Sequence, residues 1–276
     1  LTPPAEEDEC LITPIIHIDG KELDKELIEI TYDHIPTQTV LIHSEAKVVR
    51  LNIKKVGEHI GYIMGAGDEV PESLEQIGYT VHLIDPTAIE SGSLNKYDAV
   101  VTGIRAYNVI EALEFKQRFL LEYVEQGGNL IIQYNTAGRR DASFKDLAPY
   151  PLKISRDRIT NEDSEVKIIA SDHSVINFPN TITNLDFEGW VQERGLYFPD
   201  EWDPKFTPIL QMNDKGESPT NGALLVAPYG KGNYIYTGIS FFRELPAGVS
   251  GAYKLFANIL SLGKEQIDNT TDIKGK

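Results

Sequence analysis

The side chains best placed for chemistry follow four apolar runs that the sequence marks as strands. Because parallel strands joined by right-handed crossovers place their carboxyl ends on one edge of a sheet, we expect these side chains to share one cleft. Carboxylates, guanidiniums, amides and a phenol in one cleft suit a hydroxyl-rich ligand such as a carbohydrate. The alternative is that these polar residues only cap helices and turns. The candidates are Asp68 and Glu69, then Arg105, Tyr107 and Asn108, then Asn135 and Thr136, and last Arg243 and Glu244.

The two arginines of this set are expected to pair with carboxylates, because the chain as a whole is strongly acidic. Glu69 and Glu244, which also follow predicted strands, are the candidate carboxylate partners. Arginines neutralised in this way would form a rigid polar floor, which suits a neutral polyol better than a phosphate.

A second group of candidates lies in an aromatic stretch between residues 187 and 202. This stretch has the aromatic residues Trp190, Tyr197, Phe198 and Trp202 among the acids Glu188, Glu193, Asp200, Glu201 and Asp203. Aromatic faces stack on sugar rings and carboxylates bind sugar hydroxyls, so Glu188 and Trp190 are candidate ligand contacts. Equally, both tryptophans could pack an irregular insertion, in which case we expect each to be at least half buried.

Signals for cofactors and metals are weak. The run Gly65-Ala66-Gly67 lacks the third glycine of a dinucleotide-binding loop, since position 70 is Val70. The six histidines are scattered without the spacing of a zinc site, and a single cysteine, Cys10, excludes an internal disulfide. We therefore expect neither a metal nor a cofactor.

Composition limits the partners. The chain of 276 residues has 26 basic and 42 acidic residues, a net charge of −16, which disfavours nucleic acid and anionic lipid as partners. No apolar run reaches the roughly 18 residues of a membrane span. The chain opens on the polar run Leu1 to Glu9 without the features of a signal peptide, so we expect a cut end of a longer protein. The compartment stays open, with an extracytoplasmic (periplasmic) place in a bacterium as one expectation.

Three segments are expected along the chain. Residues 1–56 form a β-rich appendage or the tail of a preceding domain, in which residues 21–29 are a helical turn or a charged hairpin. Residues 57–263 alternate between strands and helices, which predicts an α/β domain with a parallel sheet covered by helices on both faces. A β-rich insertion occupies about 150–215, and 264–276 form a polar tail.

Four sequence runs resemble a known family. They are residues 103–108 (GIRAYN), 186–195 (DFEGWVQERG), 201–204 (EWDP) and 238–248 (GISFFRELPAG). As a set they resemble the C-terminal region of bacterial PIG-L/LmbE-type N-acetylsugar deacetylases, and the stretch from about 58 to 263 resembles the class I glutamine amidotransferase-like fold, which is flavodoxin-like. The resemblance implies a parent protein with a zinc-dependent deacetylase domain covalently linked to this chain.

The chain departs from both families at the catalytic positions. It has no His-Pro-Asp-Asp-type zinc run, and the turn where amidotransferases carry a cysteine reads Gln133 to Gly138. Where their histidine would follow the last core strand, this chain has Ser240 to Glu244. Thr136 is the remaining nucleophile, and no base is identifiable near it.

These departures predict a catalytically degenerate module that recognises carbohydrate or packs on a deacetylase domain. One alternative is an independent hydrolase that uses Asp68, Glu69, Glu188 or Glu244 as acid and base. The other is a structural interaction domain without a ligand.

Overall fold

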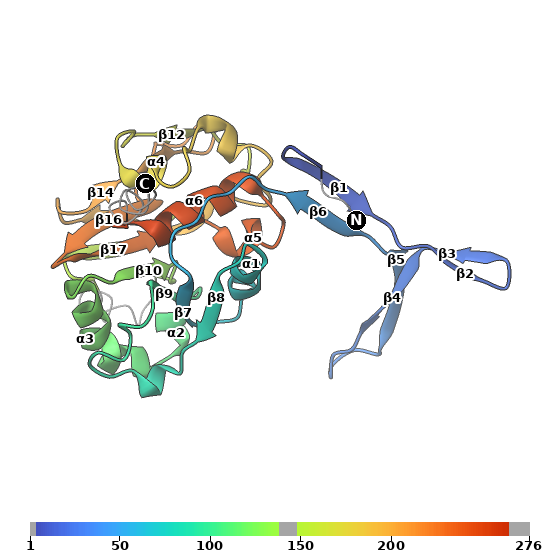
Figure 1. Cartoon of the computed structure of the whole chain (residues 1–276), viewed down its shortest axis with the longest axis horizontal. Coiled ribbons are helices and arrows are strands. Elements are labelled where there is room, and N and C mark those ends of the chain that lie inside the picture. The colour runs from blue at the N-terminus through green and yellow to red at the C-terminus, as the bar shows by residue number, and fades with distance from the viewer. Residues whose placement is uncertain (1–3, 138–147, 265–276) are drawn as a thin grey trace, which may run out of the picture. The chain divides into compact units, whose positions relative to one another are not determined.

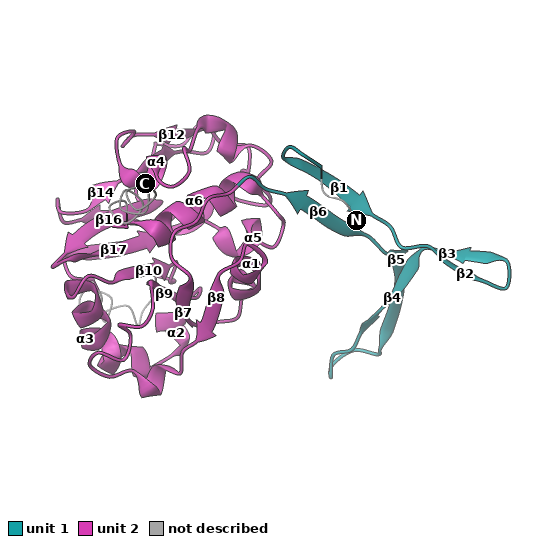
Figure 2. Cartoon of the chain, in the orientation of Figure 1, with its two compact units in different colours: residues 1–52 teal, residues 53–276 magenta. Residues whose placement is uncertain are grey.

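The fold is that of a computed structural model, which describes residues 4–137 and 148–264 (Figure 1). The chain divides into two compact units, residues 1–52 and 53–276, which Figure 2 colours separately. The division lies four residues before the expected boundary at 56. Gly138 and the expected polar tail after Lys264 lie outside the described residues.

Unit 1 consists of three two-stranded antiparallel ladders. They pair β1 (Asp8–Ile12) with β6 (Ala46–Arg50), β2 (Ile16–Ile18) with β3 (Lys21–Leu23), and β4 (Lys25–Ile30) with β5 (Gln38–His43). The segment 21–29 is therefore neither a helical turn nor a hairpin of its own, because its two strands pair with β2 and with β5 rather than with each other. Apolar side chains such as Leu11, Leu27 and Leu41 are about 60% exposed.

Unit 2 is built on a seven-stranded mixed sheet. Its strands are β7 (His59–Ile63), β8 (Thr80–Leu83), β9 (Ala99–Thr102), β10 (Asn129–Gln133), β14 (Thr207–Pro208), β16 (Leu224–Tyr229) and β17 (Gly232–Thr237), in the spatial order β14-β16-β17-β10-β9-β7-β8. The five strands β8, β7, β9, β10 and β17 are parallel. Numbered along the chain they run 2-1-3-4-5, a doubly wound order whose switch point lies between β7 and β9.

The sheet is not wholly parallel, which corrects the sequence expectation. β16 pairs antiparallel with β17, and β14 pairs antiparallel with β16. Residues 222–226 and 232–238 are joined by a tight turn, Gly230 at φ 59°, rather than by a helix. A fully buried strand reads as a continuous apolar run in either direction, so the run alone does not reveal the orientation.

Helices cover both faces of the sheet (Figure 1). α3 (Ala112–Glu125) packs with Leu130 and Ile132 of β10 in one apolar cluster. Side chains alternate along a strand, so Asn129 faces the other way and donates to the carbonyl of Ile259 in α6 (Ser250–Ser261), at 2.6 Å. Of the shorter helices, α1 (Val70–Gln76) follows β7 and α2 (Ala106–Val109) follows β9; η1 is Pro86–Ala88.

The insertion is β-rich, as expected. Its strands are β11 (Leu152–Ile159), β12 (Val166–Ile168), β13 (Gly195–Trp202) and β15 (Leu210–Met212), with the short helices α4 (Ser174–Asn177) and η3 (Asn184–Phe187). β11 pairs with β13, and β12 pairs with β15.

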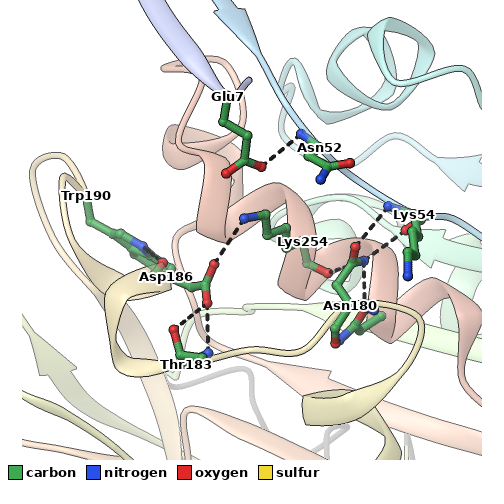
Figure 3. Close-up of polar contacts among 9 residues, drawn as sticks. Glu7, Asn52, Lys54, Asn180, Thr183, Asp186, Trp190 and Lys254 are labelled. Carbon is green, nitrogen blue, oxygen red and sulfur yellow. Dashed lines mark hydrogen bonds and ion pairs between the residues drawn. The ribbon is translucent and has the colours of Figure 1, made fainter. Parts of the chain in front are cut away.

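Buried amides fasten this insertion to the rest of unit 2. Asn180 accepts from the backbone N–H of Lys54 and donates to its carbonyl, both at 2.9 Å, as Figure 3 shows. Asn258 of α6, which is fully buried, bonds the backbone N–H and C=O of Asn180 and the carbonyl of Val175. Further along, Asp186 accepts from Thr183 and pairs with Lys254 (Figure 3).

Candidate functional site

The switch point between β7 and β9 is closed by backbone. The Ala66 N–H donates to the carbonyl of Ile104 at 2.9 Å. A Cβ on Gly65 would stand 2.1 Å from that carbonyl oxygen, and one on Gly103 would stand 2.8 Å from the Gly65 nitrogen. Glycine is required at both positions because the two backbone segments are in contact. This contact leaves no space for a pyrophosphate.

Asp68 holds this closed junction together. Its carboxylate accepts from the Tyr62 hydroxyl at 2.6 Å and from the backbone N–H groups of Val70 and Ile104, both at 3.2 Å. Gln133 extends the chain of hydrogen bonds by donating to the Tyr62 hydroxyl at 2.8 Å. Burial, and then the neighbouring Asp68, raises the pKa of Tyr62 well above its usual value. Asp68 is thus occupied in fixing three segments of chain.

Two asparagines fix the neighbouring loops in the same way. The side chain of Asn108 accepts from the Thr136 N–H at 2.8 Å and donates to the Thr136 carbonyl at 3.3 Å. Asn135 is fully buried, accepts from the Tyr107 N–H at 3.0 Å and donates to the Gln133 carbonyl. The end of β10 and the start of α2 are therefore clasped together.

Arg105 precedes α2, in the loop that Asn108 and Asn135 join to the end of β10. It follows β9 after Gly103 and Ile104, in the left-handed conformation with φ 57°, and its N–H donates to the carbonyl of Tyr134 at 2.8 Å. Its side chain is exposed. No carboxylate of the described ranges lies within ion-pair distance of its guanidinium.

Tyr134 is the centre of a group that we call the Tyr134 cluster: Arg105, Tyr134, Tyr197, Phe242 and Arg243. The rings of Tyr134 and Tyr197 are stacked, with centroids 5.9 Å apart and 11° between planes, and Phe242 lies 5.4 Å from Tyr134. The guanidinium of Arg243 covers the Phe242 ring at 4.9 Å. Burial raises the pKa of Tyr134, whereas the guanidiniums of Arg105 and Arg243 act on the phenol in the opposite direction. Both arginines are thus electrostatic neighbours of one phenol.

Backbone strain is concentrated here. Four non-glycine residues of the described chain have positive φ. One, Asp19, precedes Gly20 in the β2–β3 turn. The other three are Arg105 (57°), Tyr197 (55°) and Gln192 (66°). Two of these belong to the cluster, and Gln192 accepts from the Arg243 guanidinium. A bulky side chain such as tyrosine is rare in this conformation, and such strain is characteristic of functional sites.

The arginine of α5 (Phe241–Glu244) is held by the segment 191–194. The Arg243 Nε lies 2.9 Å from Glu193 Oε1, in an ion pair in which Glu193 is largely buried. Arg194, buried on the ring of Trp190, accepts from the Ser240 N–H through its carbonyl. This segment therefore sets the position of one side of the cluster.

Glu244 lies beneath the same segment. Its side chain is fully buried, Oε2 accepts from the Val191 N–H at 3.0 Å, and Oε1 has no partner among the described residues. Burial raises the pKa of Glu244 to about 7, although Arg194 and Arg243 favour the charged form. The carboxyl group is enclosed, so it is not positioned to meet a ligand.

The sequence candidates thus divide into several classes. Asp68, Asn108, Asn135 and Thr136 meet at the expected edge, in contacts that fix backbone. Arg105 bonds the Tyr134 carbonyl through its N–H, and Arg243 covers the Phe242 ring that packs on Tyr134. Tyr107 differs from the expectation: its hydroxyl donates to Gln117 of α3 at 2.6 Å. The partner of Arg243 is Glu193 rather than Glu69 or Glu244.

Three other candidates do not offer the expected contacts. Glu69 and Glu188 are exposed, and neither side chain has a hydrogen bond or ion pair among the described residues. Trp190 is 5% exposed and its Nε1 donates to the Asp186 carbonyl, so its face is not available to a sugar. Trp202 is also mostly buried. The packing expectation for both tryptophans is confirmed.

Sequence reasoning missed Tyr134, Gln192 and Phe242 as site residues, whereas Glu193 and Tyr197 belong to the aromatic and acidic stretch that it considered as a carbohydrate site. All but Tyr134 lie in or beside the aromatic stretch and the runs that carry the family resemblance. Their clustering depends on positive φ angles and on stacking between segments far apart in sequence. Neither the backbone angles nor the stacking produces a spacing pattern in the sequence.

Other kinds of site are less marked. No three histidine, cysteine or acidic side chains of the described ranges are arranged to hold a metal ion. In those ranges no helix has the length and apolarity to cross a bilayer. An open cavity of about 440 Å³ lies in the insertion, lined by Asp157, Trp202 and Glu217 among others.

Comparison with known proteins gives the fold and no family. No protein-family model and no curated protein matches the chain. A candidate GMP synthase component from Thermoplasma acidophilum is similar in structure, with a TM-score of 0.51 at 10% identity over 79% of this chain and 100% of that one. A ThuA-like candidate from Bacteroides uniformis gives 0.45 at 11% identity over 74% and 89%, and a β-galactosidase from Rahnella sp. R3 gives 0.42 at 14% over 78% and 32%. Of these three, only the likeness to the Thermoplasma protein, with a TM-score above 0.5, bears on the fold.

Proposed function

We propose that this chain is a non-catalytic recognition module with an amidotransferase-like, flavodoxin-like fold, which binds carbohydrate at the Tyr134 cluster beside a PIG-L/LmbE-type N-acetylsugar deacetylase. The strand order 2-1-3-4-5 and the likeness to the Thermoplasma protein support the fold. The four sequence runs quoted above support the association with a deacetylase.

The loss of catalysis follows from what occupies the two positions of an amidotransferase dyad. The turn after β10 carries Tyr134, Asn135 and Thr136 in place of a cysteine, and Asn135 is committed to the backbone. The helix after β17 carries the enclosed Glu244 in place of a histidine. Thr136 has no histidine or carboxylate partner among the described residues, so its hydroxyl lacks an activating base.

The observation that carries a binding function is the strained aromatic cluster. Holding Arg105, Gln192 and Tyr197 at positive φ costs of the order of 1–3 kcal/mol each. A module that served only as packing would gain nothing from this arrangement, because unstrained residues would pack equally well. Partly exposed rings of Tyr197 and Phe242, bordered by guanidiniums, form a surface on which a sugar ring can stack.

The test is a titration of the full chain with neutral sugars and their oligomers, including N-acetylglucosamine oligomers, by isothermal calorimetry. Tyr197→Asn removes the stacking ring, and asparagine tolerates φ 55° better than most other non-glycine residues, so the fold should be retained. We expect binding in the wild type and its loss in this variant. Phe115→Ala, which removes a 69% exposed ring from α3, should bind as the wild type does.

If no sugar binds, or if Tyr197→Asn binds unchanged, the recognition function is wrong and a structural interaction domain is the remaining interpretation. The association with a deacetylase is tested separately by the complete reading frame. A zinc deacetylase domain encoded together with this chain would support the association, and its absence from that frame would contradict it.

A further inference from the structure

The guanidinium of Arg105 points to an acidic ligand group. We propose that the sugar bound at the Tyr134 cluster carries one oxyanion group, of the kind found in uronic acids, and that Arg105 receives it. This inference rests on the proposed function and adds the chemical class of the ligand. It also changes the expectation from the sequence, which favoured a neutral polyol.

The first support is the contrast between the two arginines. Arg243 is neutralised by Glu193 at 2.9 Å and also donates to Gln192. Arg105 has no ion pair or side-chain hydrogen bond among the described residues, and it is exposed. In a chain with a net charge of −16, a cation at a cluster of aromatic rings without a carboxylate partner is unusual.

The second support is that Arg105 is held in place. Its N–H donates to Tyr134, and its carbonyl accepts from the N–H groups of Asn108 and Val109 at 2.9 and 3.2 Å. The residue thus stands at a fixed point although its φ is unfavourable for arginine. The hydrogen bond from its N–H joins Arg105 directly to the residue at the centre of the cluster, and the guanidinium favours the charged form of the Tyr134 phenol. A guanidinium presented in this way suits bidentate binding of a carboxylate.

The charges around the cluster suggest one acidic group rather than two. Arg243 and Glu193 cancel, and the Asp68 carboxylate already accepts three hydrogen bonds. Among the described residues, one positive charge, that of Arg105, is left without a counter-charge. A carboxylate balances it, whereas a phosphate dianion leaves excess negative charge.

The experiment titrates the full chain with glucuronic acid, glucose 6-phosphate and glucose, at one pH and one ionic strength. We expect glucuronic acid to bind most tightly. Arg105→Asn should weaken it by about tenfold or more, because hydrogen bonds to charged groups are among the stronger ones, and should change glucose binding little. Asparagine accepts φ 57°, so this variant should fold. Arg118→Asn, which removes an exposed arginine from α3, is the control for net charge and should bind as the wild type does.

Each outcome has a distinct meaning. If glucose binds as tightly as glucuronic acid and Arg105→Asn has no effect, the acidic-ligand inference is wrong and the recognition function stands. If glucose 6-phosphate binds best, the single-charge inference is wrong. If neither these sugars nor the neutral oligomers bind, the proposed function itself has failed.

Discussion

Glu244 is a carboxylic acid in surroundings that favour its neutral form. The side chain is fully buried, and its pKa is raised to about 7 by that burial. The charged groups near it are Arg194 and Glu193 on the segment 191–194 and Arg243 on its own helix. Lys254 of α6, the helix packed against α5, pairs with Asp186.

This environment gives a pH dependence with a definite sign. The pKa of Glu244 is higher in the folded chain than its ordinary value of 4.5, so its contribution to stability is complete below pH 4.5 and is lost as the pH rises through about 7. Glu244→Gln should remove that loss. The free energy of unfolding of the variant relative to wild type should rise by about 3 kcal/mol from pH 4.5 to pH 8, at about 1.4 kcal/mol per pKa unit.

Urea unfolding at several pH values measures this difference. Glu188→Gln, which neutralises an exposed acid, is the control and should give a nearly flat difference. An equally flat difference for Glu244→Gln would show that Glu244 does not titrate in this range.

Trp190 is a packing residue, and its truncation should be costly. The ring contacts Phe187, Phe241 and the guanidinium of Arg194, and Nε1 donates to the Asp186 carbonyl. We expect Trp190→Ala to lower the free energy of unfolding by about 3–5 kcal/mol. Trp202→Ala should lower the free energy of unfolding by less, because Trp202 is more exposed than Trp190. Equal melting temperatures for Trp190→Ala and wild type would contradict the buried position.

At the scale of elements, Asn258 joins α6 to the insertion. Asn258→Leu keeps the size of the side chain but leaves the N–H and C=O of Asn180 and the carbonyl of Val175 without partners. Since a buried group without a partner costs about 1–3 kcal/mol, the total loss should be about 3 kcal/mol or more. Hydrogen exchange should show the Asn180 amide opening first. Unchanged protection there would mean that the insertion is held by its apolar contacts instead.

The regular elements of unit 2 were largely predictable. The sequence pattern alone predicts helices over residues 71–77, 110–126 and 251–262, and α1, α3 and α6 match these ranges within two residues at each end. Apolar periodicity and glycine stops define such elements locally. The direction of β16 depends on which strand it pairs with, and that is decided by contacts distant in sequence.

For the edge of the sheet, the sequence predicted which residues lie there but not what their side chains bind. Asp68, Asn108 and Asn135 were placed at the right edge because topology brings all strand ends there. That their side chains would bind backbone rather than ligand was not predictable, because an amide has the same sequence signature in either role. The left-handed backbone of Tyr197 was not predictable, because that conformation is imposed by the surrounding structure.

At the scale of the whole molecule, the chain should lack both activities of the families that it resembles. We expect no deacetylation of N-acetylglucosamine derivatives and no ammonia release from glutamine, because the zinc motif and the cysteine–histidine pair are missing. Acetate and ammonia assays on the purified chain measure this. Chelator-sensitive deacetylation, or ammonia release that disappears in Thr136→Ala, would contradict it.

The clasps made by Asp68, Asn108 and Asn135 have a consequence for how such a module can evolve. They secure the loops of the sheet edge by binding main-chain N–H groups, which every amino acid except proline possesses. Neighbouring positions such as 105 and 242 can therefore change residue type without loosening the loops that carry them. Natural variants of this scaffold should differ at the Tyr134 cluster while Asp68, Asn108 and Asn135 stay the same. Ligand specificity can then change without a change in the loop backbone.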